Sequence, residues 1–467
     1  MRISSRRVLL VICTLAFGTA AIVAGCGSDD GVVTTPQTDA AVGQTPDTGI
    51  DGSGGFDAEL TDGPTSIDAT ALDAGDATTD ATLPDGATIT DAAVEADADA
   101  SVDAGPPPDA GPPAVQFVGR FDARTPASPR AAWPGARIVA RFSGSTEVRV
   151  LLNEQYESWM AADAGGGAPS EWDVLIDGVV QPKLVTSLGT KEYVLAQGIS
   201  LGPHTVELFK RSEAQSGNTQ FLGFVFPGGT LLPPPLRKAR RIEVIGDSSA
   251  SGYGVEPADN CAGNGGAAKY QNFRKAWPSV LGSTFDAEVY GLVYSGKGLT
   301  RNVYRPDTET MPTLYLRTNP LDNSLLHNFG SWTPELVAVM LGANDFADGI
   351  GSPNPGPVGY QDFVNAYKLF VGTLRGKYPN ALLVLAVSPT AIDGQAGAGA
   401  FTRTNIRNAI KDVIQTRAAQ GDSNLVLFAP SISPNEELTA CDGHGNTLFH
   451  NRVAAELAAL VKPRLGW

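Results

Sequence analysis

Histidine, cysteine and positive charge are scarce in this sequence of 467 residues. It has four histidines and four cysteines, and no lysine or arginine occurs between Arg7 and Arg120. The histidines form no clustered set of ligands, so the sequence predicts no metal site, and we expect no cofactor. A long stretch without positive charge, in a chain of net charge −16, gives no support for nucleic-acid binding.

The acidity belongs to the stretch 26–113, which consists mainly of Asp, Ala, Thr, Gly and Pro. This stretch holds 19 of the 50 acidic residues. Because it has few groups that could bury apolar surface, we expect a disordered, self-repelling tether. Without these acids and the three arginines of the first seven residues, 31 acidic and 31 basic residues remain, so the rest of the chain is formally neutral.

Residues 1–25 have the features of an export signal. Three arginines precede an apolar run, 8–23, that is too short for a comfortable membrane span. The sequence Val-Ala-Gly-Cys at 23–26 resembles the lipobox of bacterial lipoproteins, which implies that Cys26 carries lipid. We therefore expect an exported lipoprotein of a bacterial cell envelope, anchored to a membrane without spanning it. An ordinary secretory signal with an incidental cysteine is the alternative.

The segment 114–235 shows the pattern of a β-sandwich. Short runs with period-two alternation are separated by Gly, Pro, Ser and Asp, which is typical of antiparallel strands joined by turns. Residues 227–235 then break the pattern, and their three consecutive prolines predict a semi-rigid connector. The clearest strand-like runs are 137–142, 147–152, 172–177 and 204–209.

The segment 236–467 alternates strand-like and helical runs, which predicts an α/β fold with a parallel five-stranded sheet flanked by helices. Binding sites in such sheets lie at the carboxyl ends of the strands. The predicted strands are 241–245, 287–294, 336–341, 381–387 and 425–428. The predicted helices are 275–285, 361–377, 404–419 and 447–461.

Three short blocks in this second segment carry chemistry. Gly-Asp-Ser at 246–248 and Gly-Ala-Asn-Asp at 342–345 each follow a predicted strand, and Asp-Gly-His at 442–444 precedes the last helix. In order, they offer a hydroxyl nucleophile, an amide donor and an imidazole base. A hydrolase that attacks an ester through an acyl-enzyme needs these three groups together.

Ser248 is the predicted nucleophile. It lies closer to the end of the strand than Ser249 and Ser251, which are the competing hydroxyls in the same glycine-rich turn. The alternative for this block alone is a plain turn in which the serine caps a helix.

Two further residues could hold an oxyanion. Asn344 offers its side-chain amide, although an Asn-Asp turn after a strand is the alternative. Gly296 follows another predicted strand, and no side chain obstructs the approach of its backbone N–H. We expect its neighbour Lys297 to be solvated.

The four histidines are the candidates for the general base. His204 lies in a predicted sandwich strand, as a surface or edge residue, and His327 sits in no recognisable block. His444 lies in the loop before the last helix, where it can face the strand ends. We therefore predict His444 as the base, with His450 in the helix as a supporting residue.

These blocks resemble the SGNH, or GDSL, hydrolase superfamily, and the longer strings resemble carbohydrate esterase family 2, the acetylxylan esterase-like deacetylases. The resemblance covers nearly all of 115–467 and implies an N-terminal jelly-roll followed by the hydrolase domain. It also implies removal of acetyl groups from polysaccharides such as xylan or glucomannan. The matching stretches are 204–211, 245–248 with 252–254, 294–299, and 441–444 with Asn446.

The mechanism that this resemblance implies is a two-step acyl transfer. Ser248 attacks the acetyl carbonyl after His444 takes its proton, and the N–H groups of Ser248 and Gly296 and the Asn344 amide hold the oxyanion. Asp442 stands two residues before the histidine, whereas many superfamily members place it three before. Family 2 has the spacing seen here, and its histidine can be oriented by a main-chain carbonyl in a Ser–His dyad. The part played by the Asp442 carboxylate stays open.

Two other functions remain as alternatives. A lipase or acyltransferase on the same scaffold would need an extended apolar groove, which the sequence does not show as a distinct segment. A non-catalytic carbohydrate-binding surface lipoprotein would have no need for all three blocks. The expected partners are an acetylated polysaccharide or oligosaccharide and, through the lipid anchor, a membrane; we expect a monomer.

Two cysteines remain once Cys13 leaves with the signal and Cys26 carries lipid. Cys261 follows the nucleophile turn and Cys441 directly precedes Asp442, so both loops must converge if the nucleophile and the base are to touch. In an oxidising compartment we expect these two cysteines to form a disulfide. Two separate buried thiols are the alternative.

Overall fold

The computed structural model describes residues 115–467 apart from 157–168, 257–260, 262–265, 350–355 and 395–400. All described residues lie within one compact unit. The predicted signal, Cys26 and the tether 26–113 lie outside the described residues. None of the described helices is long and apolar enough to cross a membrane.

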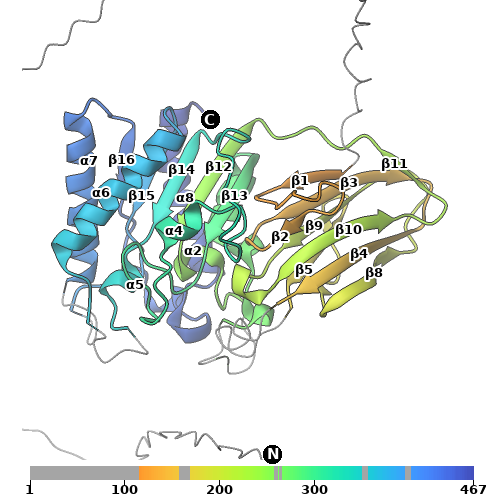
Figure 1. Cartoon of the computed structure of the whole chain (residues 1–467), viewed down its shortest axis with the longest axis horizontal. Helices are drawn as coiled ribbons and strands as arrows, with labels where there is room; N and C mark the ends of the chain where they lie inside the picture. Colours follow the sequence, from red (N-terminus) through yellow and green to blue (C-terminus); the bar gives the residue numbers. More distant parts are fainter. Residues whose placement is uncertain (1–114, 157–168, 257–260, 262–265, 350–355, 395–400) are drawn as a thin grey trace, which may run out of the picture. The chain divides into compact units, whose positions relative to one another are not determined.

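The N-terminal part of the described chain is a sandwich of two antiparallel sheets, as predicted (Figure 1). Strand β4 alternates between partly exposed and buried side chains, and its buried face packs with residues of both sheets in one core. The first sheet contains β1 (Val115–Val118), β3 (Arg137–Ser143), β9 (His204–Lys210), β5 (Glu171–Ile176), β6 (Val179–Val180), β7 (Leu184–Val185) and β11 (Thr230–Leu232). The second contains β2 (Arg130–Ala131), β10 (Asn218–Val225), β4 (Glu147–Gln155) and β8 (Gly189–Gln197).

The predicted connector 227–235 is not wholly irregular. Its residues Thr230–Leu232 form β11, which pairs antiparallel with the end of β3. The strand ends directly before three prolines, which have no N–H to donate to a ladder. The prolines therefore limit the strand to three residues at the edge of the sheet.

The C-terminal part contains a parallel five-stranded sheet in the order β13-β12-β14-β15-β16, which confirms the predicted α/β architecture (Figure 1). Every residue of β13, β14 and β15 is buried, as expected for strands covered on both faces. The strands are β12 (Arg240–Gly246), β13 (Ala287–Val293), β14 (Leu336–Met340), β15 (Leu382–Ala386) and β16 (Leu425–Phe428).

Helices cover both faces of this sheet (Figure 1). Helices α6 (Tyr360–Lys377) and α7 (Thr402–Ala419) pack on one face, and α3 (Trp277–Thr284) and α8 (Thr447–Leu465) pack on the other. The remaining helices are short. They are α2 (Ser248–Ser251), α4 (Met311–Tyr315), α5 (Ala343–Phe346), and the 3₁₀ turns η1 (Ala214–Ser216), η2 (Ala268–Tyr270), η3 (Phe273–Lys275), η4 (Asn435–Glu437) and η5 (Cys441–Gly443).

The carboxyl ends of the three strands at one side of the sheet meet at the same edge. Gly246 at the end of β12 is in register with Val293 of β13 and with Met340 of β14. The blocks 246–248, 295–298 and 342–345 begin within a few residues of these positions, so the topology gathers them at one place.

The sandwich and the parallel sheet share a buried interface. The Arg120 side chain comes from the sandwich side and lies 3.2 Å from Glu243 of β12, and both side chains are fully buried. The indole N–H of Trp133 donates to the carbonyl of Thr318 at 3.1 Å. The two parts are thus packed against each other within one compact unit.

Candidate active site

The predicted nucleophile and base are in hydrogen-bond contact. The distance between Ser248 Oγ and His444 Nε2 is 2.9 Å, and His444 Nδ1 lies 3.2 Å from the carbonyl oxygen of Cys441. Since a carbonyl oxygen can only accept, the proton of the neutral imidazole lies on Nδ1. The lone pair of Nε2 therefore faces the Ser248 hydroxyl, as a general base requires.

Ser248 begins α2 directly after β12. The side chain of Asp247 caps this short helix by accepting the N–H of Ser249 at 2.9 Å. Burial raises the pKa of Asp247 to about 7. The cap fixes the turn that presents Ser248 at the end of the strand.

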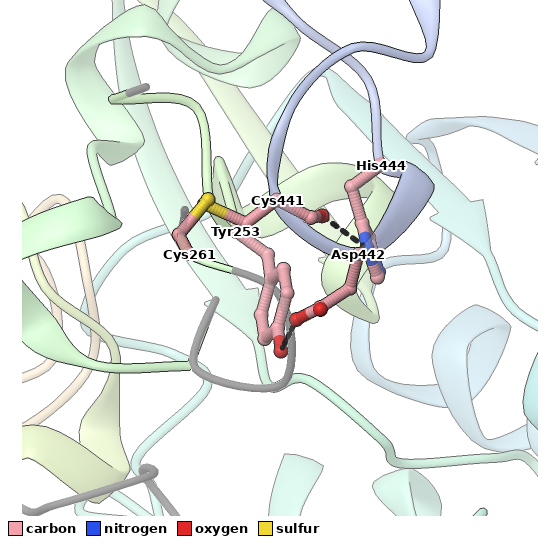
Figure 2. The surroundings of a disulfide bond; sticks show 5 residues. All are labelled: Tyr253, Cys261, Cys441, Asp442 and His444. Carbon is pink, nitrogen blue, oxygen red and sulfur yellow. Dashed lines mark hydrogen bonds between the residues drawn. A yellow bond between two sulfur atoms is a disulfide. The ribbon is translucent and has the colours of Figure 1, made fainter. Parts of the chain in front are cut away.

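His444 is presented by a loop that is fixed at both of its ends. A disulfide joins Cys441 to Cys261, which confirms the predicted link (Figure 2). On the other side, the Asn446 side chain caps α8 by accepting the N–H groups of Leu448 and Phe449. The base loop is therefore tied to the nucleophile side of the site at one end and to a long helix at the other.

The close approach of the two loops explains why a glycine is needed at position 254. Gly254, in the loop after Ser248, has a positive φ of 61°, and a Cβ built there would lie 2.5 Å from the Cβ of Cys441. Any larger residue would push the base loop away.

The Asp442 carboxylate points to a tyrosine. Tyr253 donates its hydroxyl to Asp442 Oδ2 at 2.9 Å, and its ring centroid lies 4.3 Å from that of His444 (Figure 2). The acceptor for the Nδ1–H of His444 is the carbonyl of Cys441. In this geometry a main-chain carbonyl, and not the Asp442 carboxylate, orients the base. The two-residue spacing between Asp442 and His444 had left this question open.

We expect Asp442→Ala and Tyr253→Phe to lower kcat/KM for p-nitrophenyl acetate by no more than about tenfold, the range of one net hydrogen bond. Both variants remove the Tyr253–Asp442 bond, but Tyr253→Phe keeps the ring that packs on the imidazole. Steady-state kinetics measure the two losses. A loss in Asp442→Ala as deep as that in His444→Ala would show instead that the carboxylate is essential, as in a triad.

Ser248, Gly296, Asn344 and His444 line one cavity of about 900 Å³. Among the described residues, the backbone N–H groups of Ser248 and Gly296 have no hydrogen-bond partner. The Asn344 amide donates to the carbonyl of Lys297 at 2.9 Å and, at 3.3 Å, to Asp247 Oδ2. All three residues predicted to hold the oxyanion thus line the cavity in which Ser248 lies. The two backbone donors are open, whereas the Asn344 amide already has two acceptors.

Both parts of the described chain match models of known protein families. Residues 117–235 match the family model of the carbohydrate esterase 2 N-terminal domain. Residues 244–452 match that of the GDSL-like lipase/acylhydrolase family. The two matches and the relatives described below support an SGNH hydrolase similar to the enzymes of carbohydrate esterase family 2. The chain is accordingly a carboxylic-ester hydrolase with an SGNH fold.

Named relatives of this esterase include the cellulase/esterase CelE of Acetivibrio thermocellus, which is 28% identical over 357 residues, or 76% of this chain. The chain spans 40% of the length of CelE. An acetylxylan esterase / glucomannan deacetylase of Cellvibrio japonicus is 26% identical, over 76% of this chain and 89% of that protein. A family two carbohydrate esterase from Clostridium thermocellum, solved with cellohexaose, superposes with a TM-score of 0.66 at 27% identity, over 76% of this chain and 99% of that one.

The expectation that Lys297 is solvated is wrong. The Lys297 side chain is buried in the wall of the esterase's cavity, where its ammonium pairs with Asp307 and donates to the carbonyl of Glu309 at 2.8 Å. These partners follow ten and twelve residues later in a loop that folds back over the lysine. The sequence contains no periodic pattern in this loop that would have predicted the fold-back.

Asp345 is a residue of the site that the sequence did not single out. Its buried carboxylate accepts three successive backbone N–H groups, from Leu299 at 2.9 Å, Thr300 at 2.6 Å and Arg301 at 2.9 Å. It thereby fixes the loop that follows Gly296. Its place beside Asn344 in the 342–345 block was the available signal.

The other histidines of the esterase do not contact Ser248. His450 is buried in α8, accepts the N–H of Trp277 at 3.2 Å, and has its pKa lowered by burial to about 3. Burial also lowers the pKa of His327 to about 3. His204 lies in β9, as predicted, and pairs with Asp177 at 2.6 Å.

Proposed function

We propose that the protein is a carbohydrate O-acetyl esterase that removes acetyl groups from a polysaccharide such as xylan or glucomannan. The observation that carries this proposal is the 2.9 Å contact between Ser248 and His444 in a cavity lined by two open backbone donors. The names of two relatives, a cellulase/esterase and an acetylxylan esterase / glucomannan deacetylase, support the class of substrate.

The reaction would proceed through an acetyl-enzyme. His444 Nε2 takes the proton of Ser248 as Oγ attacks the acetyl carbon, and the oxyanion that forms accepts from the N–H groups of Ser248 and Gly296. The tetrahedral intermediate then collapses, and His444 gives its proton to the departing sugar oxygen. A water molecule, deprotonated by His444, attacks the acetyl-serine and releases acetate and the free Ser248 hydroxyl.

The walls of the cavity support a hydroxylated ligand. Most of their side chains are polar, and the charged ones are arranged in pairs, such as Lys297 with Asp307 and Arg317 with Glu309. Tyr304 is 46% exposed and offers a ring face to a sugar. A lipase would need a continuous apolar groove for its acyl chain, so the ester-length assay below decides between a deacetylase and a lipase.

Acetate release tests the proposal. The esterase should liberate acetate from acetylated xylan or acetylated glucomannan but not from chitin, whose acetyl groups are amides, and Ser248→Ala should liberate none. Binding to these glycans without acetate release would favour the non-catalytic carbohydrate-binding protein. A preference for long-chain over acetyl p-nitrophenyl esters would favour the lipase.

We also propose that the protein is an exported lipoprotein anchored through Cys26. The support is the sequence of the signal, which lies outside the described residues. In a bacterial host, the full chain should take up labelled palmitate and sediment with membranes, and Cys26→Ala should lose both properties. Equal membrane association of both forms would contradict the anchor.

The pH dependence of the reaction should follow His444. Burial lowers the pKa of this imidazole below its usual 6.5. Because the base must be neutral, we expect the acid limb of kcat/KM to have its midpoint below pH 6.5, so that activity persists into mildly acidic solution. A pH–rate profile with p-nitrophenyl acetate locates the midpoint, and one above pH 6.5 would contradict this expectation.

A further inference from the structure

The sandwich inserts a buried carboxylate beneath the active site. Glu213 follows β9, is 0% exposed, and belongs to the part of the chain that matches the N-terminal family model. Its Oε2 accepts the backbone N–H of Ser295 at 2.7 Å. Its Oε1 accepts the hydroxyls of Ser295 at 2.6 Å and Ser251 at 3.0 Å.

Both serines adjoin groups of the proposed reaction. Ser251 ends α2, the short helix that Ser248 begins, and its hydroxyl also lies 3.3 Å from the carbonyl of Ser248. Ser295 directly precedes Gly296, whose N–H is one of the two open oxyanion donors. One carboxylate thus joins the nucleophile turn to the oxyanion loop, and their two hydroxyls lie 3.3 Å apart beside it.

Other buried residues hold Glu213 in place. Gln271 accepts the backbone N–H of Glu213 at 2.7 Å, and Lys210 donates to the Glu213 carbonyl at 3.0 Å. Burial lowers the pKa of Lys210 to about 8, against the attraction of Glu154 and Glu213. A buried carboxylate is costly unless hydrogen bonds compensate for lost hydration, and here three donors converge on it. Two residues later, Gln215 lines the cavity itself.

We infer that Glu213 is a positioning residue, through which the β-sandwich sets the geometry of Ser248 and the Gly296 N–H for acyl transfer. The inference rests on the proposed function. Without the carboxylate, the Ser295 N–H and both hydroxyls lose their common acceptor, and the two loops can move independently. Oxyanion stabilisation and attack depend on placement to a fraction of an ångström, so the loss falls on the transition state rather than on substrate binding. The sandwich then serves as part of the catalytic unit.

Kinetics of Glu213 variants test this role. We expect Glu213→Ala to lower kcat for p-nitrophenyl acetate by about 10²-fold, with KM changed by less than about twofold. Glu213→Gln should retain more activity than Glu213→Ala, because its one oxygen can accept the Ser295 N–H while the two hydroxyls rotate to accept from its amide. Ser295→Ala should also lower kcat, and its effect should not add to that of Glu213→Gln, since both act on the same contact.

The matched control is Glu154→Gln. Glu154 is equally buried, but its bonds go to Ser170, Thr186 and Thr219 within the sandwich. This variant should lose stability without losing kcat. A wild-type kcat in folded Glu213→Ala, or equal losses of kcat in Glu213→Gln and Glu154→Gln, would overturn the inference. If Glu213→Ala does not fold, the kcat values of Glu213→Gln and Ser295→Ala test the inference in its place.

A readout that needs no activity separates this inference from the proposed function. Hydrogen–deuterium exchange over residues 294–298 should be faster in Glu213→Gln than in the wild type, and unchanged in Glu154→Gln. An inactive wild type that shows this exchange pattern would refute the proposed esterase reaction but not the structural link. If the wild type is active but neither the exchange nor kcat changes in the Glu213 variants, only the positioning role is refuted.

Discussion

Ser248→Ala and His444→Ala should each lower kcat for p-nitrophenyl acetate by at least about 10⁴-fold, with little change in thermal stability. The two side chains form a single hydrogen-bonded unit, at 2.9 Å, so the loss of either removes the activated nucleophile. The double variant should be no worse than either single variant, because the two groups act together. Residual hydrolysis would come from the open backbone donors of the cavity.

Two neighbouring residues provide controls for this result. Ser249 is adjacent in sequence, but it is buried and its hydroxyl accepts from Ser388 at 3.1 Å, so Ser249→Ala should keep most of the activity. His450→Ala should keep some activity while losing stability, because His450 accepts the N–H of Trp277 at the start of α3. Near-normal turnover in Ser248→Ala would contradict the assignment of the nucleophile.

The fold was largely predictable because its elements have strong periodic patterns. Strand β16 was predicted at its observed bounds, and α8 was predicted to start at its observed first residue, Thr447. The end of α8 was missed by four residues, because Pro463 lies within the helix instead of ending it. Strand β11 was missed because three residues are too few to show a period, and only pairing with β3 makes them a strand.

The sequence predicts those residues of the site that directly follow the end of a strand. It does not predict the roles of residues that depend on tertiary contacts. Ser248, Gly296, Asn344 and His444 stand in blocks whose place on a parallel sheet implies that they meet. In contrast, the acceptor of the Nδ1–H of His444 depends on a φ of 56° at Asp442, which turns the loop. The role of Glu213 could not be predicted from the sequence either, because its partner Ser295 is 82 residues away and in the other part of the chain.

The disulfide between Cys261 and Cys441 should contribute about 2–5 kcal/mol to the free energy of unfolding, because it closes a long loop, with a sequence separation of 180. We expect the double variant Cys261→Ala/Cys441→Ala to lose this amount in denaturant titrations. Its kcat should fall as well, by up to about tenfold, because the carbonyl that orients His444 belongs to Cys441.

Reductant separates the covalent link from the packing of the sulfur atoms. Cys441 is buried against Ala267 and Tyr270, so replacing it by alanine also removes contacts. Reduction of the wild type breaks only the bond, and it should reproduce most of the loss in stability, whereas the double variant should not respond to reductant. Mass spectrometry of the unreduced mature protein checks the starting state. Free thiols at both positions, or a wild type indifferent to reductant, would refute the stabilising link between the base loop and the nucleophile loop.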